Sequence, residues 1–547
     1  MYMIMKNKIN PVAYFSMEIV VDEKLNNYAG GLGILAGDLL RSAADQKISM
    51  VGISLLSRFG YFKQKISSSG KQKALLENNN LKLLKKLKIT TTIQIGKDSV
   101  LVGVWQYLIK GVSGFVVPVY FLDTDFLENK KIYRNLCDHL YGGDHLYRLR
   151  QEIVLGRGGV RILEALKIKP TKFHINEGHG AFAFVELFLK NQDKTLKELK
   201  KICVFTTHSP IKEANDIFLT NEIKRNFVDF PFFLDNLIDN GELNMAKIAI
   251  YFSDFVNGVS KKHAQVSREI FSEPRIKAIT NGVHLGFWTA TSIKNIYNKY
   301  FPGWEKNNQL LNKKSLSTSD LWIAHQKNKK ELFVEILKLT GEFLAVDDFT
   351  AVIARRFAPY KRSALILEDI NRLLKIQKKN GPIQIIYAGK AHPLDVIGKK
   401  TISDVLKIKE KYKNQIKIVF LENYNISLAK LLVAGADLWI NNPLPPNEAS
   451  GTSGMKAAQN GVPQLSTPDG WWPEGCHEGK SGWTINSSKN NLDNKVMLDV
   501  LENKILPIFY QDKLKWKKIM ANTIKINAYQ FSSERAIKDY SKLIYEK

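Results

Sequence analysis

The segment from 448 to 456 carries the clearest chemical signal in the chain. It reads Glu448-Ala449-Ser450-Gly451-Thr452-Ser453-Gly454-Met455-Lys456, follows an apolar run typical of a strand, and opens a stretch typical of a helix. Free amides and hydroxyls at a helix N-terminus suit a phosphate dianion. Lys456 would then lie within reach of an aldehyde. A phosphate site beside an amine is what pyridoxal phosphate requires, although an isolated lysine is more often a solvated helix residue.

A second group of polar residues follows the apolar run at 350–354. It consists of Arg355, Arg356, Tyr360 and Lys361. An arginine fork grips two phosphate oxygens, while a lysine supplies a point charge, so Arg356 and Lys361 are our first candidates for holding a substrate phosphate. Arg355 would assist from the other side of the turn. The alternative is a solvated helix start.

The elements that must position these residues follow a repeated βα pattern. Short apolar runs that end in polar turns are expected as strands, and 319–339 as a long helix; the runs are 12–17, 172–175, 202–206, 276–279, 350–354, 383–388, 416–421 and 437–440. This pattern predicts an α/β fold with two Rossmann-like doubly wound domains facing a central cleft, since open parallel sheets bind ligands beyond the carboxyl ends of their strands. We expect domains at 1–315 and 316–530, with a terminal helix at 531–547 that packs back on the first domain.

Composition sets the class of protein. The chain has 547 residues, 44% of them hydrophobic and 24% charged, which is ordinary for a globular protein of two or more domains. No apolar run approaches a membrane span, and the three cysteines show no metal-binding spacing, so we expect a cytoplasmic protein without metal or membrane partner. The formal charge of +27 leaves two readings, polyanion binding or a lysine-rich surface throughout. The second is favoured because lysine is spread evenly, with 82–88 expected as a solvated helix face, and no nucleic-acid module is present.

The motifs together resemble one family. The segment 448–456 with Asn460-Gly461 is similar to the cofactor-lysine signature of α-glucan (glycogen and maltodextrin) phosphorylases, in the short bacterial and archaeal form. Further similar segments lie at 14–18 (Tyr-Phe-Ser-Met-Glu), 29–38, 142–144 (Gly-Gly-Asp), 205–208, 355–362 and 469–472 (Asp-Gly-Trp-Trp). The resemblance implies the glycosyltransferase architecture called GT-B, pyridoxal phosphate on Lys456, and reversible, configuration-retaining phosphorolysis of terminal α-1,4-linked glucose to α-glucose 1-phosphate. The phosphate of the cofactor would serve as proton shuttle or electrostatic partner.

The resemblance also assigns roles to single residues. It implies that Thr452, Ser453, Gly454 and Tyr424 bind the cofactor, and that Gly31 and His208 act with Arg356 and Lys361 in catalysis. Substrate contacts are implied for Gly30, Asn281, Glu448, Ala449, Ser450, Gly451, Arg355 and Tyr360. Glu177 and His179 are candidates for shaping the glucan site, with a scaffold role left open. Pro359 departs from the family pattern, which puts the shape of its loop in doubt.

Two other hypotheses remain open. A two-domain nucleotide-sugar glycosyltransferase shares the architecture, but its motif carries a second glutamate where this chain has Lys456. A non-catalytic glucan- or polyanion-binding protein would keep the fold without the chemistry. We expect α-1,4-glucan and inorganic phosphate as partners, no nucleic acid, no allosteric control of the animal kind, and an oligomeric state, such as a homodimer, that the sequence leaves open.

Overall fold

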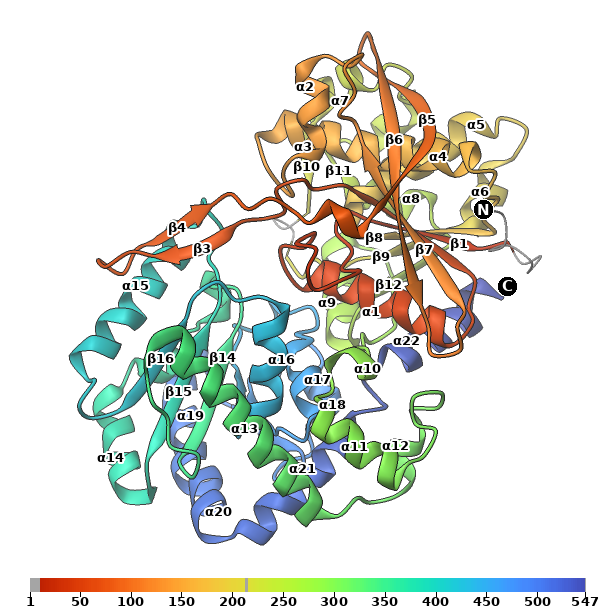
Figure 1. The fold of residues 1–547 in the computed structure, drawn as a ribbon. Helices are drawn as coiled ribbons and strands as arrows, with labels where there is room; N and C mark the ends of the chain where they lie inside the picture. Colours follow the sequence, from red (N-terminus) through yellow and green to blue (C-terminus); the bar gives the residue numbers. More distant parts are fainter. Residues whose placement is uncertain (1–9, 212–214, 547) are drawn as a thin grey trace. The chain divides into compact units, whose positions relative to one another are not determined.

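The computed structural model describes residues 10–211 and 215–546, and it divides the chain into two compact units (Figure 1). Unit 1 contains Met1–Tyr61, Leu76–Thr280 and Ala536–Lys547, whereas unit 2 contains Phe62–Leu75 and Asn281–Arg535. The division differs from the expected boundary at 315, because the segment after Asn281 packs with the second sheet. None of the helices in the described ranges is long and apolar enough to cross a membrane.

Unit 1 is built on a mostly parallel sheet. Its strand order is β13-β12-β9-β8-β1-β2-β7-β6-β5, and the pairs are parallel except for β7–β6 and β6–β5. The strands are β1 Val12–Ser16, β2 Met50–Leu55, β5 Lys85–Ile95, β6 Asp98–Lys110, β7 Val116–Asp123, β8 Lys172–Asn176, β9 Cys203–Thr206, β12 Phe255–Gly258 and β13 Lys277–Ala278, with the small pair β10 Ile217–Leu219 and β11 Glu242–Asn244. The helices are α1 Gly31–Asp45, α2 Lys131–Arg134, α3 His145–Ile153, α4 Gly159–Ala165, α5 Ala181–Lys190, α6 Leu196–Ile202, α7 Thr220–Asn226, α8 Met245–Phe252 and α9 Lys261–Phe271.

One expectation for this unit was wrong. The lysine-rich stretch at 82–88 runs mainly into strand β5 and does not form a helix face. From Lys86 onward, strand β5 alternates exposed polar residues with half-buried or buried residues that are mostly aliphatic, which suits an antiparallel edge with one solvated face. The leucines and lysines of 82–88 therefore reflect strand alternation at the edge of the sheet.

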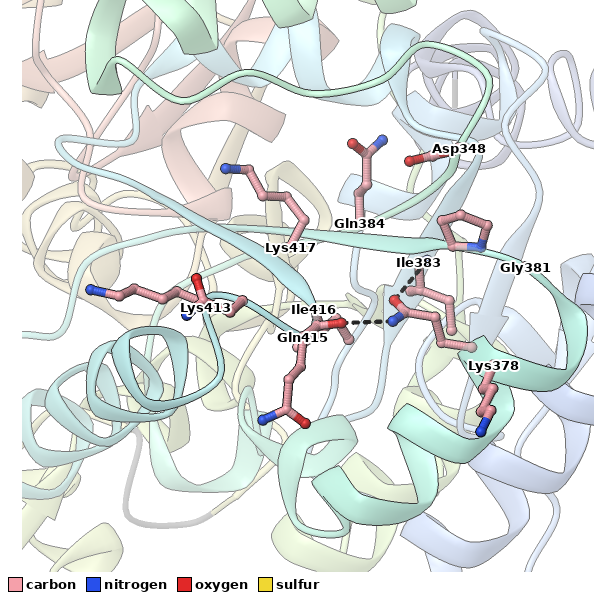
Figure 2. A pocket seen from close by; sticks show the side chains of 12 residues that line it. Asp348, Lys378, Gly381, Ile383, Gln384, Lys413, Gln415, Ile416 and Lys417 are labelled. Carbon is pink, nitrogen blue, oxygen red and sulfur yellow. Dashed lines mark hydrogen bonds between the residues drawn. The ribbon is translucent and has the colours of Figure 1, made fainter.

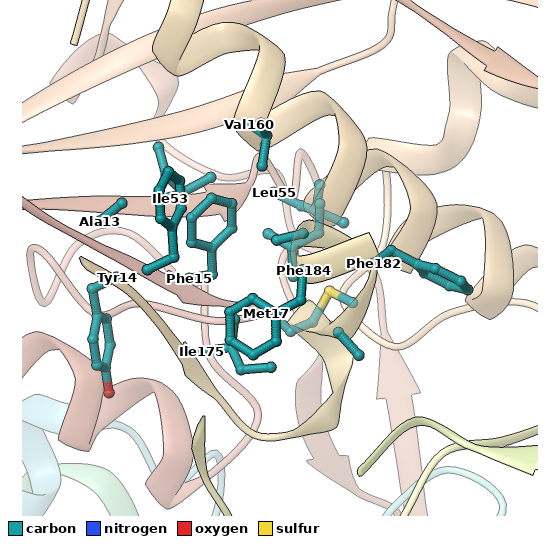
Figure 3. Packing of buried hydrophobic residues seen from close by; sticks show 14 of the residues in the cluster. Ala13, Tyr14, Phe15, Met17, Ile53, Leu55, Val160, Ile175, Phe182 and Phe184 are labelled. Atoms are coloured by element: carbon teal, nitrogen blue, oxygen red, sulfur yellow. The ribbon is translucent and has the colours of Figure 1, made fainter. Parts of the chain in front are cut away.

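The core of unit 1 lies under strand β1. Phe15, Met17, Ile53, Ile175 and Phe184 are fully or almost fully buried and belong to one cluster (Figure 3). Both neighbours of β1 are parallel to it, so its side chains pack on both faces of the sheet. The end of β1 at Ser16 is therefore buried, between the neighbouring strands β2 and β8.

The chain returns to unit 1 at Ala536, within helix α22 Ser533–Tyr540, and continues in this unit through the helical turn Ser541–Tyr545. The hydroxyl of Tyr545 lies 2.6 Å from Nδ1 of His174 on β8. The Tyr540 hydroxyl accepts a hydrogen bond from Nδ2 of Asn257 on β12 at 3.0 Å. These polar contacts lie at buried positions, so the terminal segment is part of the unit's packed interior.

Unit 2 contains a wholly parallel sheet with the order β16-β15-β14-β17-β18-β19. Its strands are β14 Phe349–Ala354, β15 Ile383–Ala388, β16 Lys417–Leu421, β17 Leu438–Asn441, β18 Gln464–Ser466 and β19 Gly482–Thr484. Its helices are α10 Leu285–Trp288, α11 Thr291–Tyr300, α12 Leu310–Lys313, α13 Thr318–Thr340, α14 Ile370–Asn380, α15 Val396–Lys411, α16 Ile426–Gly435, α17 Ser453–Ala458, α18 Trp472–Gly475, α19 Asp493–Val500, α20 Leu506–Gln511 and α21 Lys513–Asn527. The expected α/β class with parallel sheets and covering helices is confirmed in both units.

A β-hairpin from the first part of the sequence also belongs to unit 2 and lies beside α15 (Figure 1). Its strands are β3 Lys63–Ile66 and β4 Gln72–Leu75. The Gln64 side chain donates to the carbonyl of Gly389 at 2.9 Å and accepts from the amide of Asn423 at 2.8 Å. The Gln72 side chain exchanges hydrogen bonds with the backbone of Ala391. The hairpin thus pins the loops that follow β15 and β16.

Candidate functional site

The predicted phosphate-binding cations of unit 2 lie on the loop after β14. Arg355 is buried, and its guanidinium donates to the carbonyl of Lys361 at 3.0 Å. Burial lowers the pKa of Arg355 to about 10, and the neighbouring Glu448 opposes that shift. The Lys361 ammonium forms an ion pair with the Glu448 carboxylate. The Lys361–Glu448 ion pair therefore joins the loops that follow β14 and β17 at the carboxyl edge of the sheet.

The Asp469-Gly470-Trp471 motif forms hydrogen bonds with the loop that carries Glu448. The Asp469 carboxylate accepts from the amides of Glu448 at 2.8 Å and Gly470 at 2.9 Å. Gly470 has φ +58°, and a Cβ there would lie 2.4 Å from the carbonyl oxygen of Ser450, so a glycine is required. Burial raises the pKa of Asp469 to about 7, with the nearby Glu448 charge acting in the same direction.

Lys456 lies in α17, with only 5% of its surface exposed. Its Nζ is 3.8 Å from the ring centroid of Trp288, which comes from α10. The Asn460 side chain joins the two elements, because Nδ2 donates to the carbonyls of Lys456 at 2.9 Å and Trp288 at 3.1 Å, while Oδ1 accepts from the amide of Ala290 at 2.8 Å. The second half of the lysine signature, Asn460, thus fixes an aromatic face against the amine.

The segment that carries Lys456 has features that fit a planar aldehyde with a phosphate group. An amine lies against an indole face, Gly451 has the left-handed φ of +76°, and the Ser450 hydroxyl is a buried polar group with no hydrogen-bond partner within the described ranges. At position 454 a glycine is required by close packing, since a Cβ there would lie 1.6 Å from Oε1 of Gln464. The Ser453 hydroxyl accepts a hydrogen bond from Nε1 of Trp439 at 3.2 Å.

The remaining predicted residues of unit 2 divide into two groups. Tyr360 lies under the Lys361 ammonium, 4.9 Å from ring centroid to Nζ, and both Tyr360 and Tyr424 act electrostatically on Arg355. Arg356 is exposed and lies near His392, whose pKa is lowered by burial and by this arginine. The two adjacent arginines therefore diverge, with Arg355 inside and Arg356 outside. Pro359 begins the short 3-10 turn Pro359–Lys361 that carries Lys361.

The glycines at the start of α1 fall into two kinds, according to whether a Cβ would have space. A Cβ at Gly33 would meet the Glu18 side chain at 2.9 Å, and one at Gly37 would meet the carbonyl oxygen of Val20 at 2.0 Å, so close packing explains both. A Cβ at Gly30 or Gly31 would find no described atom within 4 Å. These two glycines leave open space beside the N-terminus of a 15-residue helix, as an anion site requires.

Glu18 holds this loop in place. Its carboxylate accepts from the amides of Ala29 at 2.6 Å and Gly30 at 3.4 Å, and from the hydroxyl of Tyr141 at 3.0 Å. Burial raises the pKa of Glu18, although its hydrogen bonds oppose the shift. The segments at 14–18 and 142–144 were recognised in the sequence only as motifs, and Tyr141, the residue before the second motif, joins it to the first through Glu18.

His208 follows β9 and is held from both ends. Its backbone amide donates to the Glu177 carboxylate at 2.7 Å, and that carboxylate also accepts from the Ser209 hydroxyl at 3.0 Å and the Gly178 amide at 3.0 Å. Glu177 itself has φ +75°. Both oxygens of its carboxylate therefore accept hydrogen bonds from neighbouring protein groups. Burial lowers the pKa of His208 well below 6.5, so its ring is neutral at physiological pH.

His179 and Asn281 lie at two different places. His179 Nε2 is 3.1 Å from the carboxylate of Asp216, which also pairs with Arg148 at 2.8 Å, and His179 Nδ1 is buried with no hydrogen-bond partner in the described chain. Asn281 is the first residue of the second stretch of unit 2, and its carbonyl accepts from the guanidinium of Arg535 at 3.2 Å. The structure thus brings Gly30, Glu177, His179 and His208 together in unit 1.

Sequence reasoning missed several residues of these sites. Trp288 and Asn176 carry no signature of their own, and Asn460 and Asp469 were quoted only as parts of motifs. Their neighbours are distant in sequence, so spacing alone could not find the contacts. A surface pocket of about 620 Å³ in unit 2 lies elsewhere, at the amino ends of β14 to β16 (Figure 2). Its Lys413 and Lys417 are already paired with Glu410 and Glu342, which leaves it without the features of a built anion site.

Comparison with known proteins decides the family. The chain is 36% identical to a maltodextrin phosphorylase of Thermococcus litoralis, over 98% of this chain and 70% of that protein. It belongs to the carbohydrate phosphorylase family. It is also 35% identical to a glycogen phosphorylase of Aquifex aeolicus, over 98% of this chain and 86% of the relative, and 32% identical to a glycogen phosphorylase of Mycobacterium tuberculosis, over 98% and 70%.

Two family models match overlapping parts of this phosphorylase. The carbohydrate phosphorylase model matches residues 207–474, which include the cation loop and Lys456. The starch synthase catalytic domain model matches residues 27–281, which include the glycine loop and His208. The predicted resemblance and the glycosyltransferase fold class are confirmed, and the starch synthase match explains why a synthase was a reasonable alternative.

Proposed function

We propose that this α-glucan phosphorylase carries pyridoxal phosphate on Lys456 and works on terminal α-1,4-linked glucose of glycogen or maltodextrin. The enzyme splits the glucan end with inorganic phosphate and releases α-glucose 1-phosphate. The observation that carries the cofactor proposal is the buried Lys456 amine, 3.8 Å from the ring centroid of Trp288. The same segment of the chain contains the buried Ser450 hydroxyl, which has no hydrogen-bond partner within the described residues. When bound, the cofactor supplies a phosphate group whose second pKa, about 6, suits proton exchange near neutral pH.

In this proposal, the protein residues hold and orient the reacting groups. Thr452 and the amides of 452–454 receive the cofactor phosphate, and Trp288 and Tyr424 enclose its ring. Arg355, Arg356 and Lys361 neutralise the substrate phosphate, because two adjacent dianions repel unless fixed cations separate their charge. Glu448 orients Lys361 through their ion pair. Burial of Arg355 and Glu448 strengthens the interactions that these two residues make, whereas Arg356 acts from an exposed position.

The sugar side of the proposal uses unit 1. His208 presents a neutral ring to the glucose and the Gly30–Gly31 loop leaves space for the anion beside the start of α1. A neutral imidazole adds no repulsion as positive charge develops on the reacting carbon. Glu177 is assigned a positioning role, because its oxygens already hold the His208 loop. We also propose cytoplasmic action without nucleic-acid, membrane or metal partners, and a homodimer that gel filtration would test.

The decisive experiment joins cofactor and activity. Purified protein should show pyridoxal phosphate absorbance, borohydride should trap the label on Lys456, and Lys456→Ala should lose both label and phosphate-dependent release of glucose 1-phosphate. Lys430→Ala is the matched control, because Lys430 Nζ also lies over an aromatic ring, 3.9 Å from the centroid of Phe287. Full turnover by cofactor-free protein would overturn the proposal.

One observation favours a second candidate, the starch synthase match over residues 27–281. A donor-swap assay separates the two. The synthase hypothesis predicts glucan extension from ADP- or UDP-glucose, whereas the phosphorylase predicts extension from glucose 1-phosphate only. Lys456 lies at the position that distinguishes the two motifs, and this favours the phosphorylase.

A further inference from the structure

A short hydrogen-bond relay lies behind His208 in unit 1. The Ser16 hydroxyl, at the end of β1, donates to the carbonyl of Glu18 at 2.8 Å. The Asn176 side chain, at the end of β8, lies between this hydroxyl and His208, with Nδ2 3.1 Å from Ser16 Oγ and Oδ1 2.5 Å from His208 Nε2. Ser16 is 1% and Asn176 1% exposed, so water does not compete.

The donor and acceptor of every hydrogen bond in this relay follow from the Glu18 carbonyl at one end of it. A backbone carbonyl only accepts, so the single hydroxyl proton of Ser16 must point to Glu18. The Ser16 oxygen can then only accept from Asn176, which places the Asn176 amide nitrogen toward Ser16 and the amide oxygen toward His208. An amide oxygen also only accepts. His208 must therefore donate through Nε2.

We propose that Asn176 is a positioning residue that keeps the proton of His208 on Nε2 and thereby presents Nδ1 toward the substrate as a hydrogen-bond acceptor. Within the described chain, Nδ1 has no hydrogen-bond partner of its own. The inference rests on the proposed function, in which His208 faces the glucose. It adds that Ser16 and Asn176, neither of which touches substrate, select which nitrogen of His208 is protonated.

The surroundings of His208 keep its ring uncharged. The groups that act on it are His174, His179 and His263, and burial together with these histidines lowers its pKa. The Glu177 carboxylate lies at the His208 backbone amide and is held by three hydrogen bonds, so it does not act as a counter-ion of the ring. A neutral imidazole has one donor and one acceptor nitrogen, and the relay decides which is which.

The first test needs no variant in the relay. Holoenzyme labelled with 15N-histidine is measured in a long-range nitrogen–proton correlation spectrum, and His208 is assigned among the 10 histidines by its loss in His208→Gln. The expected pattern is a neutral ring protonated at Nε2 throughout the pH range of activity. A ring protonated at Nδ1, or an imidazolium, would overturn the inference while leaving phosphorolysis intact.

The second test changes the relay. Asn176→Asp is isosteric but places a carboxylate at Nε2, which favours the imidazolium and turns Nδ1 into a donor. We expect kcat to fall about tenfold to hundredfold at neutral pH, with recovery as pH rises through the new, higher pKa of His208. Ser16→Ala frees the Asn176 amide to rotate and should give a mixture of tautomers with a smaller loss of kcat.

Ser54→Ala is the matched control, because it removes a buried hydroxyl that donates to the carbonyl of Met17 at 3.1 Å, outside the relay. It should leave both the tautomer and the pH profile of kcat unchanged. A pH profile for Asn176→Asp that parallels the wild type, in a protein with normal cofactor absorbance, would contradict the inference. If the purified wild-type protein contained no pyridoxal phosphate and showed no phosphorolysis, that result would instead count against the proposed function.

Discussion

Charged side chains at the carboxyl edge of the parallel strands have different partners in the two units. In unit 1 the carboxylates of Glu18 and Glu177 are turned onto backbone amides, and burial keeps His208 neutral. In unit 2 the same edge gathers charged groups, with Lys361 paired to Glu448 and Arg355 buried beside them. The two edges therefore differ in how these carboxylates are held, by backbone amides at Glu18 and Glu177 in unit 1 and by an ion pair at Glu448 in unit 2.

The family comparisons fit this contrast. The starch synthase model covers the glycine loop and His208, features that a sugar-transferring enzyme needs whatever its donor. The phosphorylase model, which matches 207–474, also covers His208 and extends over the cation loop and the lysine segment. We infer that His208 of unit 1 serves the glucan, and that the cations of unit 2 contribute most to phosphate binding, alongside the open space at Gly30 and Gly31 of unit 1. The four predictions below test this division.

The largest effect is expected at Lys361. Lys361→Met removes a cation and leaves Glu448 unpaired, so kcat/KM for phosphate should fall about 100- to 1000-fold, as for loss of one preorganised electrostatic contact. Initial rates over a phosphate titration measure it. Lys361→Arg, which keeps the charge, should lose less. If His208→Gln in unit 1 raised the KM for phosphate as strongly as Lys361→Met, the division between the units would fail.

The next effect concerns the pH dependence of stability through Asp469. Its folded pKa of about 7 lies above the unfolded value near 3.8, so the stability linked to this group is complete below about pH 4 and is lost as pH rises through 7. From pH 5 to pH 8, the wild type should lose about 2–3 kcal/mol of unfolding free energy relative to Asp469→Asn. Denaturant unfolding at pH 5, 6.5 and 8 checks this.

Asp512→Asn serves as the control for that series, since it changes an exposed carboxylate at the start of α21 and corrects for net charge. Parallel stability curves for the wild type and Asp469→Asn would show that the Asp469 carboxyl is already ionised at pH 5. The charged character of the unit 2 edge would then extend to Asp469 over the whole range.

A smaller effect separates the glycines of unit 1. Gly31→Ala adds a Cβ in open space at the first turn of α1, so stability should stay the same or rise by about 0.5–1 kcal/mol while activity falls. Gly37→Ala pushes a Cβ against the Val20 carbonyl and should cost about 1–3 kcal/mol of stability. Thermal unfolding and initial rates are measured on both. Equal destabilisation of the two variants would remove the argument for an anion site at Gly31.

The smallest effect is expected in the hairpin. Gln64→Ala removes hydrogen bonds to Gly389, Gln72 and Asn423 and should lower stability by about 1–2 kcal/mol with little change in KM for glucan. Urea unfolding and glucan titrations test it. Gln192→Ala, which removes exposed hydrogen bonds to the carbonyls of Phe188 and Leu189, is the control. A raised KM for glucan alone would assign the hairpin to substrate binding instead.

The sequence predicted much of the fold because strong local patterns persisted. The strand expected at 383–388 is β15 Ile383–Ala388, and the helix expected at 319–339 is α13 Thr318–Thr340. Buried parallel strands are near-continuous apolar runs, which are easy to recognise. Edge strands are not, and the lysine-rich β5 was mistaken for a helix face. The place of 62–75 in unit 2 was also missed, since its contacts join Gln64 to residues more than 300 positions away.

For the site, the sequence by itself determined which groups are present. The segment 448–456, the cation loop at 355–361 and the glycines at 30 and 31 are local strings whose chemistry is written in adjacent residues. Their roles as site residues stay predictions until they are tested. The identity of the family followed from the same strings and is confirmed by the near full-length relatives.

Only the tertiary structure decided how those groups are held. Trp288 reaches Lys456, Tyr141 reaches Glu18, and Ser16 reaches His208 through Asn176, each across a long stretch of sequence. Burial then sets the charge, raising the pKa of Asp469 and lowering that of His208. Hydrogen-bond direction and desolvation depend on which atoms surround a group in space, so no spacing along the chain can specify them.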